Sequence, residues 1–284
     1  MKTLTKAACS LLMTLPLVAC AQPEEPAKTQ TNEQGCTYNI SRGPQDPYQN
    51  PPPLKQACLG PHLLEIPQHY YETQMGPWFD GLFALALEYP SLEPFKPGER
   101  MNLSVDVSVR TVYVKYTYID RTTVEEVMRK QFAPTDSRRE KPEGSLETRI
   151  RGEPDNGLTP YYVDMAKVIA HYRAKGYAED APVMRADWHT DWFLSEDAGN
   201  EVTTVIKCTA REVASSGVEY REGKMVKSDE YGMASCDHIL MMPELDLIVR
   251  IRYPREGLHQ WMRIDGRARQ MMSDFMVKNE GEAN

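Results

Sequence analysis

The N-terminal segment sets the conditions under which the rest of the chain folds. Lys2 and Lys6 give it a positive start, and residues 7–19 form a mostly apolar run. The run is shorter than the roughly 20 apolar residues that a helix needs to cross a bilayer. It is typical of the apolar region of a secretory signal peptide. We therefore expect residues 1–19 to be removed and the remaining chain to fold in a compartment that oxidises thiols.

The signal peptide ends in the residues Leu-Val-Ala-Cys at positions 17–20, which resemble a bacterial lipobox. This motif implies cleavage before Cys20, followed by acylation of the Cys20 thiol and of the new amino group. The alternative is an ordinary signal peptide with a cysteine there by chance. Because two or more acyl chains anchor a protein stably, we expect a lipid anchor on the periplasmic face of the envelope. Ala21, rather than an aspartate, favours the outer membrane.

Residues 20–35 contain no large apolar side chain, so we interpret them as a lipidated flexible tether. A random coil of this length reaches about 20 Å. The whole chain has a net charge of −8, and losing Lys2 and Lys6 with the leader makes it more acidic. An acidic balance argues against a nucleic-acid partner. Beyond the leader no stretch is apolar enough to span a membrane, so the lipid is the expected membrane contact.

Four cysteines remain after the leader and Cys20 are set aside. They are Cys36, Cys58, Cys208 and Cys236. An even number in an oxidising compartment predicts two disulfides, with three possible connectivities. We favour Cys36–Cys58 and Cys208–Cys236 because each pair is close in sequence. Catalytic or metal-binding thiols are the alternative, although no pair has a zinc-type spacing.

The body of the chain has the pattern of an α+β protein with two similar-sized halves, residues 36–150 and 151–284. Each half is expected to hold antiparallel strands and a packed helix, behind the lipoprotein signal and tether. The two halves could be a duplication or a coincidence, because strand–strand–helix units are common. Residues 133–157, rich in proline, glycine and charge, are expected to be a linker or long exposed loop with a short strand near 146–150.

Several elements follow from the spacing of apolar residues. In the first half, residues 82–88, 103–109 and 112–118 are expected to be strands, the last two forming a hairpin. Thr122 or Thr123 is expected to cap a helix. In the second half we expect a helix over 161–175, strands near 192–194, 201–211 and 245–253, and a final helix over about 256–277 with Trp261 on its apolar face.

The sequence holds no recognisable catalytic or metal-binding motif. Serine-hydrolase, zinc-protease, phosphate-loop and calcium-loop signatures are absent from the sequence, and no two histidines lie four residues apart. We therefore expect no catalytic residue, no metal and no cofactor.

The one suggestive cluster is Asp187, Trp188, His189, Asp191 and Trp192. On a strand, His189 and Asp191 would share one face and the two tryptophans the other. An acidic–aromatic patch of this kind could bind a partner protein, because tryptophan is an effective interface anchor. Two alternatives stay open. The tryptophans could be core residues beside solvated charges, or His189 and Asp191 could form a metal or acid–base site.

Several segments together resemble the lipoprotein immunity proteins of type VI secretion systems, most closely those paired with phospholipase effectors. They are the lipobox at 17–20, Cys36 with residues 58–67, residues 89–94, residues 157–162, residues 191–193, residues 206–208 and the helix with Trp261. The resemblance spans most of the mature chain. It implies a non-catalytic protein that binds a cognate antibacterial effector in the periplasm and blocks it by occlusion. It assigns no particular contact residues.

Two other functions remain open at this point. The chain could be an envelope lipoprotein that binds a lipid, a peptidoglycan fragment or an assembly partner, which a large apolar cavity between the halves would favour. It could also be a periplasmic enzyme with an unfamiliar site at His189 and Asp191, which would require a third polar group in the same cleft.

Overall fold

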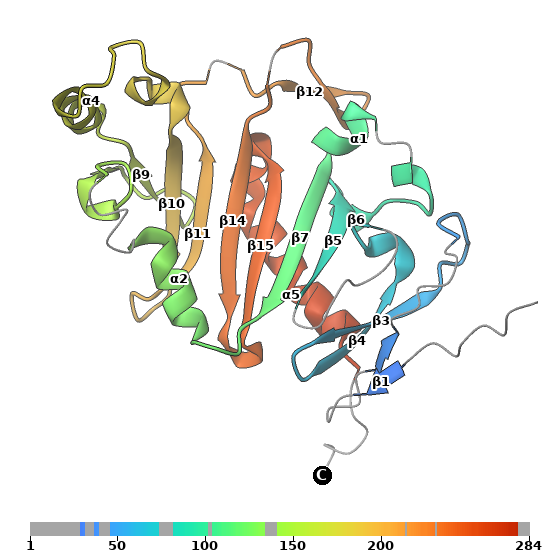
Figure 1. Ribbon diagram of the computed structural model, residues 1–284. Helices are drawn as coiled ribbons and strands as arrows, with labels where there is room; N and C mark the ends of the chain where they lie inside the picture. The colour runs from blue at the N-terminus through green and yellow to red at the C-terminus, as the bar shows by residue number, and fades with distance from the viewer. Residues whose placement is uncertain are drawn as a thin grey trace, which may run out of the picture.

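One antiparallel sheet of nine strands organises the part of the chain that the structure describes (Figure 1). The structure is a computed structural model, and it describes residues 29–31, 37–39, 46–73, 82–101, 104–133, 141–213, 215–230 and 232–277. In spatial order the strands are β6 (Glu93–Pro94), β5 (Leu82–Glu88), β7 (Thr111–Tyr118), β15 (Leu247–Pro254), β14 (Ser235–Met242), β11 (Val202–Thr209), β10 (Thr190–Glu196), β9 (Thr159–Tyr162) and β8 (Ile150–Arg151).

The remaining elements surround this sheet. Three separate strand pairs are β1 (Thr29–Thr31) with β2 (Thr37–Asn39), β3 (Leu54–Leu59) with β4 (His62–Pro67), and β12 (Val218–Arg221) with β13 (Lys224–Lys227). The α-helices are α1 (Val105–Val109), α2 (Val124–Phe132), α4 (Met165–Ala174) and α5 (Trp261–Phe275). Short 3-10 turns are η1 (Gln68–Tyr70), η2 (Glu99–Met101), η3 (Leu146–Thr148), η4 (Pro182–Met184), η5 (Ala186–Trp188), η6 (Pro243–Leu245) and η7 (Arg255–Gln260).

The expected α+β class with antiparallel strands is confirmed, and strands from both expected halves share the one sheet. β7, from the first half, pairs along its length with β15, from the second. The helix that follows β7 also crosses the boundary near residue 150, since α2 packs on strands β11, β14 and β15. The two ranges of sequence therefore contribute to common layers.

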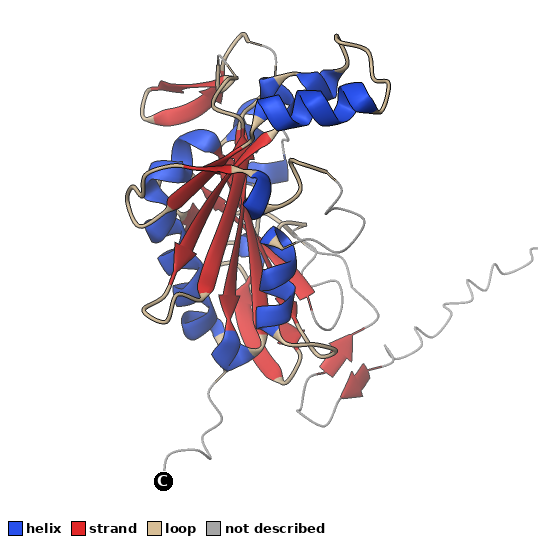
Figure 2. Ribbon diagram, turned by 90° about the vertical axis from the view of Figure 1, so that its left-hand side faces the viewer, coloured by secondary structure: helices blue, strands red, loops and turns tan. Residues whose placement is uncertain are grey.

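The two faces of the sheet are covered differently. Figures 1 and 2 show α2 on one face and α5 on the other. Because side chains alternate along each strand, Val114, Leu240 and Ile251 point toward the α5 side, where they join the larger core. Alternate residues such as Val205, Ile239 and Ile248 point the other way and pack with Val124 and Met128 of α2. The smaller helix α2 covers only part of its face.

Helix α5 is held by the apolar stripe that its sequence predicts. Ile264, Ala268 and Met271 are almost completely buried, spaced three or four residues apart. Tyr116 of β7, also fully buried, donates a hydrogen bond from its hydroxyl to the Ala268 carbonyl at 2.8 Å. The expected helical stretch over 256–277 divides into η7 and α5. Burial of such a stripe, at about 25 cal/mol per Å² of apolar surface, is the main force that holds a helix on a sheet.

The expected strand over 103–109 is wrong, because residues 105–109 form helix α1. The Ser104 side chain accepts a hydrogen bond from the Val107 amide and so caps the helix. Asp106 lies in the first turn, where a negative charge is favourable. Thr111 donates from its hydroxyl to the Val107 carbonyl at 2.6 Å. These local polar contacts outweigh the strand preference of the alternating valines, and β7 pairs with β5 and β15 instead of forming the expected hairpin.

Two further expectations concern residues 146–175. The first two residues of the expected 161–175 helix, 161 and 162, are the end of strand β9. The helix starts only at Met165, where Asp164 caps it. The short strand expected near 146–150 within the linker is present as β8 (150–151), preceded by the turn η3. Arg149 fixes this segment by donating to the carbonyls of Tyr161, Thr190 and Glu143 at 2.8–3.2 Å. The segment has no apolar periodicity, and the hydrogen bonds of the buried Arg149 guanidinium hold it in place instead.

The expected pairing of Cys208 with Cys236 is present as a disulfide between neighbouring strands β11 and β14. It closes a loop of 28 residues in sequence separation, which stabilises a fold by about 3–4 kcal/mol in the chain-entropy model. Cys58 is also disulfide-bonded. Its expected partner, Cys36, lies outside the described residues, as do the leader, Cys20 and most of the tether. No helix within the described ranges has the length and apolarity to span a membrane.

One histidine lies within the larger core. His238 on β14 is completely buried. Its Nε2 is 3.7 Å from an Asp265 carboxylate oxygen, and its Nδ1 is 3.4 Å from the Tyr253 hydroxyl. Burial lowers the pKa of His238 below its usual 6.5, although the Asp265 carboxylate opposes the shift. The folded protein therefore holds this histidine neutral at a pH where the unfolded chain begins to protonate it.

This difference predicts a pH dependence of stability. Below pH about 6.5 the unfolded chain takes up a proton that folded His238 resists, so the free energy of unfolding should fall as the pH drops. Denaturant titrations at pH 7.5 and 5.5 should show a loss that is smaller, by on the order of 1 kcal/mol, in His238→Phe. His69, whose pKa is also lowered by burial, remains in both proteins. Equal losses in the two proteins would contradict the assignment.

Candidate functional site

The five residues of the predicted acidic–aromatic patch lie at the start of β10 and in the η5 turn before it. Asp187 and Trp188 belong to η5, whereas Asp191 and Trp192 are the second and third residues of β10. The structure does not bring all five to one surface. His189, Asp191 and Trp192 are buried, and only Trp188, with 64% of its surface exposed, is fully open to a partner.

Asp191 and Trp192 point to opposite faces of the sheet, as neighbours on a strand must. Asp191 is the cross-strand neighbour of Cys208, on the α5 face, and Trp192 is opposite Lys207. His189 is anchored separately by a contact of 2.9 Å between its Nε2 and the Val183 carbonyl. The indole of Trp192 lies between two cations, with the Arg149 guanidinium 3.8 Å and the Lys207 ammonium 4.1 Å from ring centroids. These three buried side chains therefore have structural contacts at the start of β10.

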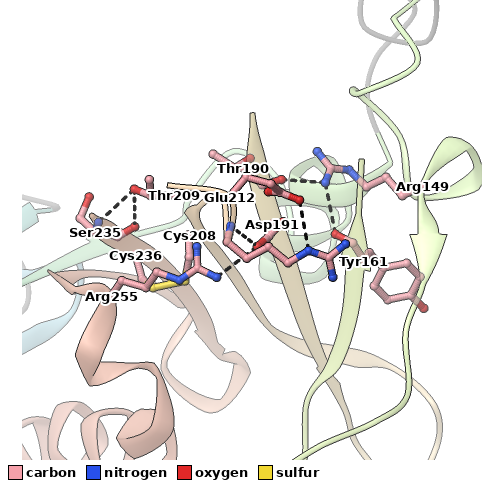
Figure 3. A network of polar contacts seen from close by, with 11 residues as sticks. Arg149, Tyr161, Thr190, Asp191, Cys208, Thr209, Glu212, Ser235, Cys236 and Arg255 are labelled. Carbon is pink, nitrogen blue, oxygen red and sulfur yellow. Dashed lines mark hydrogen bonds and ion pairs between the residues drawn. A yellow bond between two sulfur atoms is a disulfide. The ribbon is translucent and has the colours of Figure 1, made fainter. Parts of the chain in front are cut away.

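Asp191 is the centre of a polar network beside the disulfide (Figure 3). Its carboxylate accepts a hydrogen bond from the backbone amide of Arg211 at 2.9 Å and pairs with the Arg255 guanidinium at 3.1 Å. Burial raises the pKa of Asp191 above its usual value, and the contacts with Arg255 and Arg211 oppose the shift. The network ties β10 to the start of η7, where the chain turns from β15 toward α5.

A groove of about 650 Å³ opens next to this network. Arg255 forms part of its wall, so the buried pair and the groove are continuous. Apolar side chains and carboxylates both contribute to the lining. The lining residues are Glu153, Asp155, Asn156, Leu158, Pro160, Tyr162, Phe193, Arg255, Glu256, Leu258 and His259. A lining with apolar walls and three carboxylates suits an apolar or basic side chain of a partner.

A tight turn positions one side of the groove. Asn156 and Gly157 both have positive φ angles, 48° and 75°, and the two flanking residues exchange backbone hydrogen bonds of 2.9 Å. Trp261, the first residue of α5, donates from its indole to the Asn156 carbonyl at 2.8 Å. Residues 153–157, which belong to the expected linker, form this side of the groove. The Asn-Gly pair, a strong signal for a two-residue hairpin turn, could have revealed it.

The site offers binding contacts more clearly than chemistry. No group of three or more histidine, cysteine, aspartate or glutamate side chains suited to a metal ion occurs among the described residues. His189 and Asp191, the pair considered for acid–base work, are each bound to separate partners. The accessible features are the exposed indole of Trp188 and the carboxylate-lined groove.

The Asp191 network predicts a difference between two substitutions. Asp191→Ala removes the acceptor and leaves the Arg255 guanidinium and the Arg211 amide unpaired, which should lower the free energy of unfolding by roughly 2–3 kcal/mol. Asp191→Asn keeps an acceptor oxygen. Because burial raises the pKa of Asp191, the fold does not favour its charge, and the amide should cost only about 1 kcal/mol. Urea titrations of both variants measure this, and equal losses would show that the charge itself is required.

The comparisons with known proteins find similarity among solved structures. No protein-family model matches the chain, and no curated protein matches it in sequence. Among solved structures, the chain is similar to Smlt3025, an immunity protein of the Stenotrophomonas maltophilia type IV secretion system. That match has 25% sequence identity and a TM-score of 0.69, covering 88% of this chain and 99% of the other.

A second solved structure is the Neisseria meningitidis iron-regulated outer membrane lipoprotein FrpD, with 8% identity and a TM-score of 0.41, covering 87% of this chain and 99% of that one. The likeness to Smlt3025 extends over most of this chain and nearly all of the other.

Proposed function

We propose that this chain is an immunity protein, which binds a cognate antibacterial effector and neutralises it by occlusion without catalysis of its own. The observation that carries this proposal is the similarity to Smlt3025 over 88% of the chain. The fold fits the role, because a sheet tied by a disulfide offers a rigid surface that loses little conformational freedom on binding. The exposed Trp188 and the carboxylate-lined groove give contacts suited to a protein partner.

The proposal has two finer parts. The first is that the effector is a phospholipase of a type VI secretion system, which rests on the sequence resemblance, whereas Smlt3025 serves a type IV system. The second is that a lipid at Cys20 holds the protein on the periplasmic face of the outer membrane, which rests on residues 17–20. A tether raises the effective concentration of the protein where a membrane-attacking enzyme arrives.

The main test is complex formation with the product of the adjacent reading frame. The full-length chain, purified from membranes in detergent, should co-elute with that product as one peak in size-exclusion chromatography. It should also abolish the product's hydrolytic or growth-inhibiting activity at about equimolar ratio, as expected of a complex with nanomolar or tighter Kd. An effector of an unrelated secretion system serves as the control. Assays for phospholipid hydrolysis and for export through either secretion system decide the finer assignment.

Two separate peaks, with the partner's toxicity unchanged, would contradict the immunity role. The next candidate would then be an envelope lipoprotein that binds a lipid, a peptidoglycan fragment or an assembly partner.

The anchor is tested by Cys20→Ser in cells. Without the thiol no thioether-linked lipid forms, and at least two acyl chains are lost from the membrane contact. We expect the wild-type chain to sediment with outer membranes and a large fraction of the variant to leave that fraction. Trypsin resistance of both proteins checks that the body remains folded. Unchanged outer-membrane fractionation of the variant would show that the anchor lies elsewhere.

A further inference from the structure

Three cations form an exposed stripe on the face of the sheet that α2 only partly covers. Lys115 of β7 and Arg250 and Arg252 of β15 are all exposed. Their immediate neighbours Val114 and Ile251 are buried on the α5 side, so alternation places the three cations on the opposite face. We call Lys115, Arg250 and Arg252 the cationic stripe.

Two members of the stripe face each other at a position that the sheet fixes. Lys115 and Arg250 are direct cross-strand partners on β7 and β15. Like charges in this arrangement destabilise a sheet. Within the described part of the chain, neither side chain has an ion-pair partner. Arg252 has a weak ion-pair partner, Asp237, at 3.8 Å, and both of these side chains are 65% exposed.

The composition makes this grouping more informative. The chain has 41 acidic residues and 33 basic ones, so acidic side chains are the more plentiful choice for a surface position. A second like-charged cross-strand pair, Arg221 and Lys224 in the β12–β13 hairpin, has an acidic neighbour, because Glu219 contacts Arg221 directly. Among the described residues no acidic side chain contacts Lys115 or Arg250, and the one carboxylate on the neighbouring strand at this face, Asp237, is paired with Arg252. The surface around Lys115 and Arg250 therefore carries an excess of positive charge.

The surroundings of the stripe suit contact with a second protein. Tyr113, half-buried, is the cross-strand partner of Arg252 and adds an aromatic surface of the kind enriched at interfaces. Ala84 is the cross-strand partner of Lys115 on the other side and leaves the surface low there. The strands β5, β7, β15 and β14 hold the backbone of these residues in fixed register, so the positions from which the charges project are preorganised.

We propose that the cationic stripe is the docking surface for an acidic segment of the effector. This inference rests on the proposed immunity function and names the surface that would perform it. A partner with carboxylates facing Lys115 and Arg250 would relieve their repulsion and gain complementary charge contacts. Such contacts accelerate association and are weakened by salt. The carboxylate-lined groove beside Asp191 lies on the α5 face, so it does not compete with the cationic stripe for this acidic segment.

The test is a set of charge reversals in the full-length chain. Lys115→Glu and Arg250→Glu should each weaken binding to the effector at least about tenfold at low salt, mainly through slower association, with a smaller effect at high salt. Each replaces a repulsive cross-strand pair by an attractive one, so the melting temperature of the free protein should rise by roughly 1–3 °C. A variant that loses binding while gaining stability has not failed through misfolding.

The matched control is Lys224→Glu in the β12–β13 hairpin. It makes the same change in net charge and also removes a like-charged cross-strand pair, but it lies outside the stripe. Its effector affinity should stay within about twofold of wild type. Equal losses in all three variants would mean that net charge, not the stripe, controls association, and would overturn the inference.

Two further outcomes separate this inference from the function on which it rests. If the wild-type chain binds no effector, the proposed function and the docking surface both fail. If the wild-type chain binds and the stripe variants bind equally well, the immunity function stands and the docking surface is wrong. The surface is also wrong if the reversals leave effector binding intact but abolish binding to vesicles of anionic phospholipid, because the stripe would then contact lipid headgroups.

Discussion

The antiparallel ladder between β7 and β15 is the constraint on which the rest of the structure depends. It pairs residues 113–118 with residues 247–252, which are separated by most of the folded chain. Strands β5 and β6 are attached on one side of this ladder and all strands from β14 to β8 on the other. Since one residue of slip would exchange the two faces, the register of this pair decides which side chains form the larger core and which face the open side.

The ladder also explains why the two helices have unequal roles. On the α5 face, apolar residues of β7 and β15 meet the long apolar stripe of α5, together with the β3–β4 hairpin, in one continuous core. On the other face, β7 and β15 carry cations at 115, 250 and 252, so an apolar helix cannot pack there. The smaller cluster of α2 accordingly lies over β10, β11, β14 and the far end of β15. The three cations therefore limit how much of this face α2 can cover.

The sequence predicted the elements whose residue pattern is local. It did not predict contacts between residues that lie far apart along the chain. Alternation identified β7 and β15, and Thr123 caps α2 as expected. The same alternation failed at 105–109, where Ser104 and Thr111 supply polar contacts that valine spacing does not reveal. No periodicity could show that Arg149 fixes the 146–151 segment, because its partners are backbone carbonyls far along the chain.

The candidate site was predictable to a similar extent. Asp191 and Trp192 could be recognised as residues of interest. They point to opposite faces of the sheet, however, and both are buried there. Their environments arise from Arg255 and Arg149, residues 64 and 43 positions away in sequence. The groove needed the Asn156-Gly157 turn to be recognised, and that signal was present in the sequence.

The cationic stripe shows how stability and binding separate in this fold. Lys115 and Arg250 cannot move apart, because their neighbours Val114 and Ile251 are locked into the core beneath them. Their repulsion is a cost of at most about 1 kcal/mol, small beside the hydrophobic stabilisation of the sheet. The core is therefore stable enough to keep two like charges next to each other. A partner with complementary charges finds both of them at one place on the surface. The strands fix the backbone positions of these charges, so binding has to order only the exposed Lys115 and Arg250 side chains and not the segment that carries them.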